Sequence, residues 1–331
     1  MTRSLRSCCL LVLAACAAPG ASSPAAPPDG AATSSVPGAT RAPGVEAVSL
    51  LGRPLVSAPI PAERRARLEA DLSAAERALA AAPTDEAALI WYGRRLAYLG
   101  RYAEAQHAFT RGLAVHPDSH RLLRHRGHRS ITRRQLEAAV ADLERAASLI
   151  RGVPDAIEPD GEPNAAGIPR STTHSNVYYH LGLAHYLRGD LRAARDAYER
   201  ALEYSFVNDD MLVATTHWLY MTLRRLGEHE AAQALLAPIS SDMDVLENDA
   251  YLQCLLLDRG ERAPAQVLEW AAARQDPITD ATVGYGVANW HLVEGRRDLA
   301  RRMFEAIVAG PAWPAFGYVA AESELARGTA R

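Results

Sequence analysis

The chain has 331 residues, of which 48% are hydrophobic and 23% are charged, and its formal net charge is −3. This composition is sufficient for a buried core, and the slightly negative net charge offers no overall electrostatic attraction for phosphate backbones, so we expect no nucleic-acid partner. Three of the four cysteines lie within the first 16 residues, and Cys254 lies in an apolar run, which indicates a core thiol rather than a disulfide framework.

The first residues have the composition of a secretory signal. Arg3 and Arg6 precede an apolar run that is too short to span a bilayer, so we expect residues 1–15 to be a signal peptide that is removed. The motif Leu13-Ala14-Ala15-Cys16 resembles the lipobox of bacterial lipoproteins, and simple cleavage without a lipid is the alternative. The resemblance implies palmitate-type acylation of Cys16. Because Ala17 replaces the aspartate of an inner-membrane retention signal, it also implies a lipid-anchored place in the bacterial cell envelope, on the periplasmic face of the outer membrane.

The segment that follows, residues 16–60, consists mainly of Ala, Pro, Ser and Gly and has almost no charge before Glu46. Such a sequence cannot bury enough apolar surface to fold. We therefore predict a disordered, semi-extended tether that acts as a passive spacer.

Amphipathic helical spacing then runs from residue 61 to residue 328, and its clearest unit is the hairpin Ser175–Val207, hinged at Gly189. The register resembles the tetratricopeptide repeat, a 34-residue helix-turn-helix. The residues at its positions 4, 7, 8, 15, 17, 20, 24 and 27 are Tyr178, Leu181, Gly182, Gly189, Leu191, Ala194, Tyr198 and Ala201.

The resemblance implies an all-α solenoid of about six repeats plus flanking helices over residues 61–328. Residues 86–118 match the repeat pattern strongly. The next unit, residues 119–149, has Arg134 where the turn glycine is expected, which predicts a tighter or distorted turn. The segment Pro314–Arg327 is expected to be a last helix that caps the end of the array.

An insert interrupts the array at residues 151–175, where four prolines prevent a helix. It carries the acids Asp155, Glu158, Asp160 and Glu162. Loops this long in compact domains are usually functional or disordered. Because the insert leaves the array beside arginine-bearing repeats, its acids would cover the groove as a lid if it folded inward. An exposed, mobile loop is the alternative.

In the family that the sequence resembles, the first helix of each repeat lines a concave groove. The same positions here predict a basic, aromatic groove made of Arg94, Tyr98, Arg121, Arg124, His128, Tyr179, Tyr186, His217 and Arg224. Exposed arginines and tyrosines anchor interfaces, although solvated arginines are also common on helix faces. We therefore expect a scaffold or adaptor that binds a protein or peptide partner in the cell envelope.

The alternative is a small-ligand or metal-binding protein, possibly an enzyme, that uses the His/Arg cluster of the groove beneath the acidic insert. His125 and His128 are three residues apart on one helix, but no HExxH or cysteine spacing accompanies them. The sequence also lacks a P-loop, a nucleophile elbow and a dinucleotide fingerprint. We therefore predict no catalytic residue, no metal and no cofactor, and we favour a protein that is not an enzyme.

Overall fold

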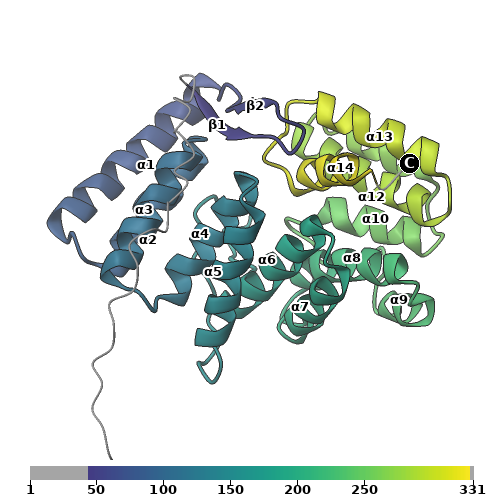
Figure 1. The fold of residues 1–331 in the computed structure, drawn as a ribbon, viewed down its shortest axis with the longest axis horizontal. Coiled ribbons are helices and arrows are strands. Elements are labelled where there is room, and N and C mark those ends of the chain that lie inside the picture. The colour runs from purple at the N-terminus through teal and green to yellow at the C-terminus, as the bar shows by residue number, and fades with distance from the viewer. Residues whose placement is uncertain (1–43, 329–331) are drawn as a thin grey trace, which may run out of the picture. The chain divides into compact units, whose positions relative to one another are not determined.

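The computed structural model describes residues 44–328, and this part of the chain forms fourteen α-helices and one small antiparallel hairpin (Figure 1). The helices are α1 (Ala62–Ala81), α2 (Glu86–Tyr98), α3 (Tyr102–Val115), α4 (His120–Thr132), α5 (Leu136–Leu149), α6 (Thr173–Arg188), α7 (Leu191–Glu203), α8 (Asp209–Leu226), α9 (His229–Leu235), α10 (Asp249–Asp258), α11 (Pro264–Ala272), α12 (Pro277–Val293), α13 (Arg297–Ala309) and α14 (Phe316–Arg327). The predicted all-α class is confirmed. Among the described helices, none is long and apolar enough to cross a membrane.

Consecutive helices pack as hairpins, from α2 with α3 through to α12 with α13. Each of the early hairpins also packs on the next, through the contacts of α3 with α4, α5 with α6, and α7 with α8. Six such pairs lie between α1 and α14, which confirms the predicted solenoid of about six repeats with flanking helices. The core is therefore built between neighbours in the chain, as a repeat array requires.

A glycine marks the closest approach of the two helices in each of the first three hairpins. Cβ atoms at these glycines would meet a large side chain at the repeat's position 24, in the pairs Gly93–Phe109, Gly127–Leu143 and Gly182–Tyr198. A Cβ at Gly182 would lie 2.7 Å from the ring of the fully buried Tyr198. The recurrence of this contact shows that the register assigned from the sequence is correct.

The turn between α4 and α5 contains Arg134 and departs from our expectation. Arg134 has a φ of 62°, the same left-handed conformation that Gly189 adopts at the equivalent turn with a φ of 89°. The turn is thus neither tighter nor distorted. A left-handed conformation costs a non-glycine residue roughly 1–2 kcal/mol, so contacts of the arginine side chain must compensate.

Those contacts reach α14, near the end of the chain. Arg134 Nε donates to Glu322 Oε2 at 2.7 Å, and Arg134 Nη2 donates to the carbonyl of Trp313 at 2.8 Å. Both members of the ion pair are almost wholly buried, with side-chain exposures of 1% and 0%. The residue that looked like a defect in the repeat therefore joins the second hairpin to the last helix.

The helix α14 is not an outer cap, contrary to our expectation. It packs on α12, α13 and α6, and all residues from Gly317 to Glu324 are buried. Glu324 pairs with Arg225 of α8. The array curls so that its last helix contacts the inner side of earlier repeats (Figure 1). The predicted apolar face was correct, but the two acids pair inside the array rather than face water.

The predicted tether is wrong for its last part, because residues 45–56 form the two strands β1 (Val45–Val48) and β2 (Pro54–Val56). The backbone of Ala103 on α3 donates to Glu46, and the backbone of Leu50 donates to Glu322 on α14. The hairpin therefore bridges the first and last repeats. Its buried residues Ala47 and Leu55 supply the apolar anchor that the proline-rich composition concealed. Residues 57–60 are described and form neither helix nor strand, whereas residues 16–43 of the tether, including Cys16, and the signal peptide lie outside the described residues.

Candidate binding groove

The insert between α5 and α6 folds inward over α2 and α4. It is closed at its base by a β-bridge between Ile157 and Thr172. Beneath it lies a cavity of about 190 Å³. Four of the predicted groove residues line this cavity, namely Arg94, Tyr98, Arg124 and His128. The structure thus brings these four side chains together at one place, with the insert opposite them.

The arginines of α2 bind the backbone of the insert. Arg94 Nη1 donates to the carbonyl of Pro159 at 2.8 Å, and Arg95 Nη1 donates to the carbonyl of Gly161 at 2.9 Å. Gly161 packs so closely on Tyr98 that an added Cβ would overlap the phenol. The insert is therefore held here as an extended segment whose carbonyl groups accept from guanidinium groups.

The acid Glu158 enters the groove and meets α4. Its Oε2 lies 3.2 Å from Arg124 Nη2, and its Oε1 lies 3.2 Å from His125 Nε2. Asn176 Nδ2 also donates to Oε2, at 2.7 Å. Burial alone would raise the pKa of Glu158, but the charge of Arg124 and the contact with His125 outweigh it and lower that pKa below its ordinary value. Glu158 is thus a charged, buried carboxylate bound by the groove.

A second acid of the insert, Glu162, is held at the rim. It lies 2.9 Å from Arg64 and 3.1 Å from Arg67, both on α1. These arginine side chains are about half exposed, so each pair contributes little to stability, on the order of 0–1 kcal/mol. Their effect is on orientation, because they fix the far end of the segment that begins at Glu158.

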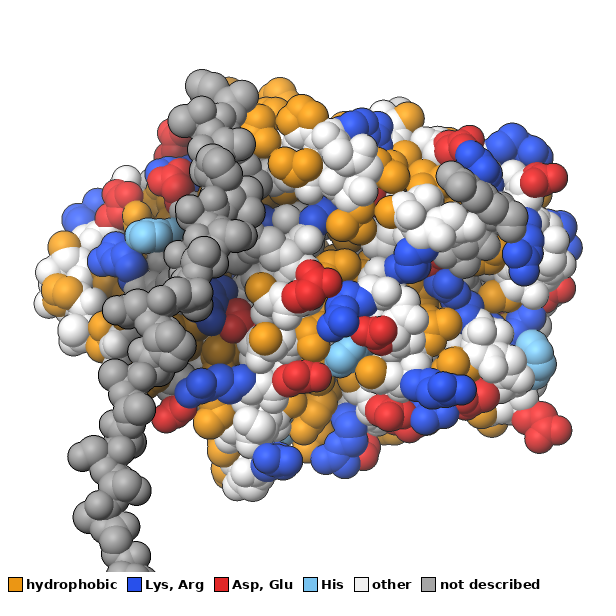
Figure 2. Space-filling model, in the orientation of Figure 1, with side chains coloured by type: hydrophobic (Ala, Val, Ile, Leu, Met, Phe, Trp, Pro, Cys, Tyr) orange, Lys and Arg blue, Asp and Glu red, His pale blue; other side chains and the backbone are white. Residues whose placement is uncertain are grey.

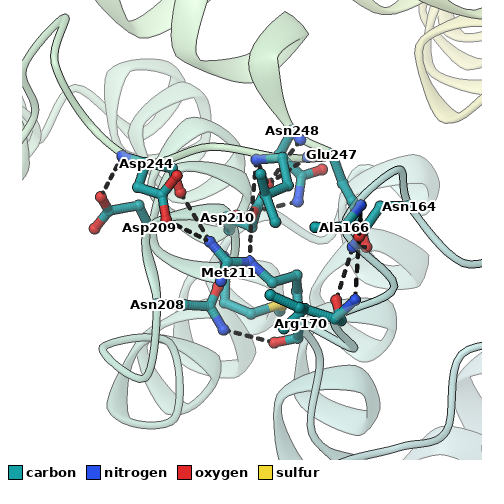
Figure 3. A network of polar contacts seen from close by, with 12 residues as sticks. Asn164, Ala166, Arg170, Asn208, Asp209, Asp210, Met211, Asp244, Glu247 and Asn248 are labelled. Atoms are coloured by element: carbon teal, nitrogen blue, oxygen red, sulfur yellow. Dashed lines mark hydrogen bonds and ion pairs between the residues drawn. The ribbon is translucent and has the colours of Figure 1, made fainter.

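The returning arm of the insert is fixed by a polar network around the buried carboxylate of Asp210 (Figure 3). Arg170 Nε donates to Asp210 Oδ2 at 2.7 Å, and the backbone N–H groups of Glu247 and Asn248 donate to Oδ1 at 2.7 and 2.9 Å. Burial would raise the pKa of Asp210, but the bonds from Arg170 and these N–H groups lower it. Asn164 also donates to Glu247, at 2.6 Å. The insert is therefore anchored to α8 and to the segment before α10.

The histidines near the cavity are neutral. Burial lowers the pKa of His125 and of His180 to about 3, with a further contribution from the charge of Arg124. Burial also lowers the pKa of His128 well below its usual value, and its ring lies 4.4 Å from that of His180. In the part of the chain that the structure describes, no group of three or more His, Cys, Asp or Glu residues is arranged to hold a metal ion.

The C-terminal half of the predicted groove is not a groove. Tyr186 and His217 are 0% and 1% exposed, and Tyr179 is also buried. They lie in an aromatic core, where Tyr186 meets the ring of Trp218 edge-on and His217 stacks on Tyr251. The hydroxyl of Tyr179 donates to that of Tyr251. The prediction that these three residues face a partner is wrong, because α10, α12 and α14 pack against α8 and α6 and fill the space that an open superhelix would leave.

The two remaining predicted residues lie apart from the cavity and have partners. Arg121 lies 3.2 Å from Glu86, and Arg224 lies 2.7 Å from Glu294. The visible face of the molecule likewise carries basic and acidic side chains next to each other rather than a patch of one sign (Figure 2). Of the predicted groove residues, those that line the cavity therefore lie on α2 and α4.

Sequence reasoning missed five arginines that belong to this site: Arg64, Arg67, Arg95, Arg129 and Arg170. Arg64 and Arg95 contact the insert, and Arg129 lines the cavity. For Arg129 a signal existed, since it follows His125 by four residues and must lie on the same side of α4. The sequence around Arg64 does not indicate this contact, because its partner Glu162 lies 98 residues later in the chain.

Comparison with known proteins supports the repeat assignment. Residues 175–205 match the family model of the tetratricopeptide repeat. This segment is similar to a tetratricopeptide repeat. It coincides with the hairpin of α6 and α7, whose register was read from Gly182 and Gly189, so that resemblance is confirmed for this unit. No curated protein matches the sequence.

Solved structures with a similar arrangement share little sequence with the chain. A tetratricopeptide repeat protein from Parabacteroides merdae is 15% identical over 78% of this chain and 93% of its own, with a TM-score of 0.46. YrrB, described as a TPR protein with an unusual peptide-binding site, is 15% identical over 72% of this chain and 92% of its own, with a TM-score of 0.40. MamA is 14% identical over 62% of this chain and 100% of its own, also with a TM-score of 0.40.

Proposed function

We propose that this protein is a lipid-anchored adaptor of the bacterial cell envelope that binds an acidic, extended segment of a protein partner. The binding surface would be the arginine face of α2 and α4 together with its rim on α1. No chemical step is assigned to it, because His125 and His128, the two histidines that line the cavity, are neutral and the arginines act only as hydrogen-bond donors and charges.

One observation carries this proposal: the groove already holds such a segment, which is the chain's own insert. The stretch Ile157–Pro163 reads IEPDGEP. Its two glutamates lie on arginines, and two of its carbonyls accept from Arg94 and Arg95. A planar guanidinium offers several donors to carboxylates and carbonyls, so the same face suits an acidic partner peptide in trans.

The insert would then compete with the partner for this face. A tethered segment acts at an effective concentration in the millimolar range, so a partner binds weakly unless the insert is loosened. Weakening the insert should therefore strengthen binding in trans, whereas removing a groove arginine should weaken it. These opposite effects distinguish a shared binding face from a partner site elsewhere on the protein.

The test uses a fluorescently labelled peptide of sequence IEPDGEP and measures its anisotropy with the purified protein. The double variant Glu158→Gln/Glu162→Gln should bind the peptide at least about tenfold more tightly than the wild type, which corresponds to the loss of about 1.4 kcal/mol of competing contact. Adding Arg94→Ala to that variant should reverse the gain. A matched peptide with both glutamates replaced by glutamine is the control. If no variant binds the acidic peptide better than the control peptide, the proposal is wrong.

The envelope location is part of the same proposal and depends on Cys16. The motif Leu13-Ala14-Ala15-Cys16 supports acylation there, and several acyl chains would hold the protein stably on a bilayer. Cys16→Ala should move the protein from the membrane fraction to the soluble fraction, and the wild-type N-terminal peptide should carry lipid mass. Membrane retention of the variant together with a wild-type peptide free of lipid would contradict this assignment.

A further inference from the structure

The cavity beneath the insert contains a guanidinium group without a counter-charge, that of Arg129. Its guanidinium carbon lies 5.5 Å from the ring centre of Tyr102. Arg129 forms no hydrogen bond and no ion pair with any residue that the structure describes, whereas the other arginines around the cavity have partners. Arg129 is partly buried and lines the cavity, so its guanidinium group can bind an anion that enters the cavity.

Other donors on α4 converge on the same space. Arg124 lines the cavity with a second guanidinium group, whose two terminal nitrogens contact Glu158 and His125. His128 also lines the cavity, and its lowered pKa leaves a neutral ring with one N–H to donate. Burial lowers the pKa of Arg129 to about 10, so its guanidinium remains charged at neutral pH.

We propose that this cavity binds a compact oxyanion, of the size of phosphate or a small carboxylate, through Arg129 with Arg124 and His128 beside it. The volume of about 190 Å³ is a few times the roughly 30 Å³ of one water molecule, which suits a small ion rather than a peptide chain. Pro159 and Asp160 of the insert form the opposite wall. The ligand is therefore a free anion bound between α4 and the insert, and it differs from the partner segment that would displace the insert.

The oxyanion would also stabilise the closed insert. A bound anion neutralises the repulsion between Arg129 and Arg124, and Arg124 is the residue that holds Glu158. Binding of the anion and closure of the insert should therefore favour each other, by thermodynamic reciprocity. This link gives the anion a regulatory effect on the peptide face without requiring that the anion touch the partner.

The experiment measures thermal unfolding and isothermal titration of the full chain without its lipid, with inorganic phosphate and with acetate as probes. Sodium chloride at equal ionic strength controls for general screening of charge. We expect saturable stabilisation by at least one of the two probes beyond the chloride control. Stabilisation by phosphate would indicate a phosphate ligand, and stabilisation by acetate would indicate a carboxylate ligand.

Two variants make the test specific. Arg129→Gln should weaken anion binding at least tenfold, while its midpoint in chloride alone should equal or exceed that of the wild type, because an unbalanced charge is removed. Arg121→Gln is the matched control on the same helix, since Arg121 lies outside the cavity and pairs with Glu86, and it should bind the anion as the wild type does.

Absence of any phosphate or acetate effect beyond chloride would overturn the inference, and so would equal anion affinity in the wild type and Arg129→Gln. Neither result depends on peptide binding. The anisotropy assay above tests the partner proposal separately, because Arg129→Gln retains the arginines that bind the insert. Failure of anion binding can therefore be distinguished from failure of peptide binding.

Discussion

Replacing Arg134 by glycine should destabilise the protein, although glycine is the residue that the repeat pattern favours at this turn. The change would relieve the left-handed backbone of Arg134, a gain of about 1–2 kcal/mol. It would also leave Glu322, which is fully buried, without its cationic partner. Breaking a buried ion pair by removing one member costs about 3–5 kcal/mol. The difference predicts a net loss of roughly 1–4 kcal/mol.

The assay is urea unfolding followed by far-UV circular dichroism at pH 7.5. A second variant tests the cause, because Arg134→Gly combined with Glu322→Gln removes the unpaired charge while the amide oxygen still accepts from the backbone of Leu50. The double variant should regain at least about 1 kcal/mol over Arg134→Gly alone. If Arg134→Gly is as stable as the wild type, the ion pair does not hold α14 to the second hairpin and our reasoning about this contact is wrong.

Four further substitutions, of which Gly284→Ala is a control, test the packing and the buried His217. Gly182→Ala should cost about 1–3 kcal/mol because its methyl group would overlap the ring of Tyr198, whereas Gly284→Ala, which meets only the flexible Ile307, should be neutral or stabilising in the same urea assay. Tyr198→Phe should leave stability unchanged or raise it by up to about 1 kcal/mol, since the phenol is buried without a partner, and a loss above 1 kcal/mol would show that a partner exists. Burial lowers the pKa of His217 to about 3, so its neutral form stabilises the fold above the unfolded pKa near 6.5, and this contribution is lost as pH falls from there towards 3. Between pH 7.5 and 5.5 the wild type should lose about 1 kcal/mol more than His217→Gln, and equal losses would place the imidazole in water.

The local features of the fold could be predicted because each depends on residues close in sequence. Gly182 and Tyr198 lie in one hairpin, and their spacing alone identifies the close approach of its two helices. The interruption of the helical array at the insert, residues 151–175, could likewise be predicted from its prolines. Helical hairpins follow from such short-range patterns, whereas the path of the whole array depends on contacts between distant repeats.

The curl of the array could not be predicted for that reason. The sequence predicted only a tighter or distorted turn at Arg134, and it did not show that this residue pairs with Glu322, 188 residues later in the chain. Tyr186 and His217 were assigned to a groove because the repeat positions assume an open superhelix. The hairpin at residues 45–56 was missed because its strands are short and lie beside a proline-rich stretch.

The candidate site was predictable in part. The acids of the insert could be placed near the arginines of the neighbouring repeats by chain connectivity, and Glu158 does lie on Arg124. The sequence did not show that Arg129 lacks a partner, since charge balance inside a cavity depends on the three-dimensional position of every carboxylate. The hydrogen bonds from Arg94 and Arg95 to carbonyl groups of the insert could not be predicted either, because every residue has a backbone carbonyl and the sequence does not show which ones accept.

Hydrogen exchange across the insert tests the central claim most directly, namely that the insert and an acidic partner segment occupy the same face. In the free protein the amide of Glu158 donates to the carbonyl of Ser171 at 2.9 Å, so the insert should exchange slowly. Saturating IEPDGEP peptide should accelerate exchange throughout the segment from Ile157 to Pro163 and leave α6 unchanged. Unchanged or slower exchange in that segment, with the peptide shown to be bound, would contradict the account.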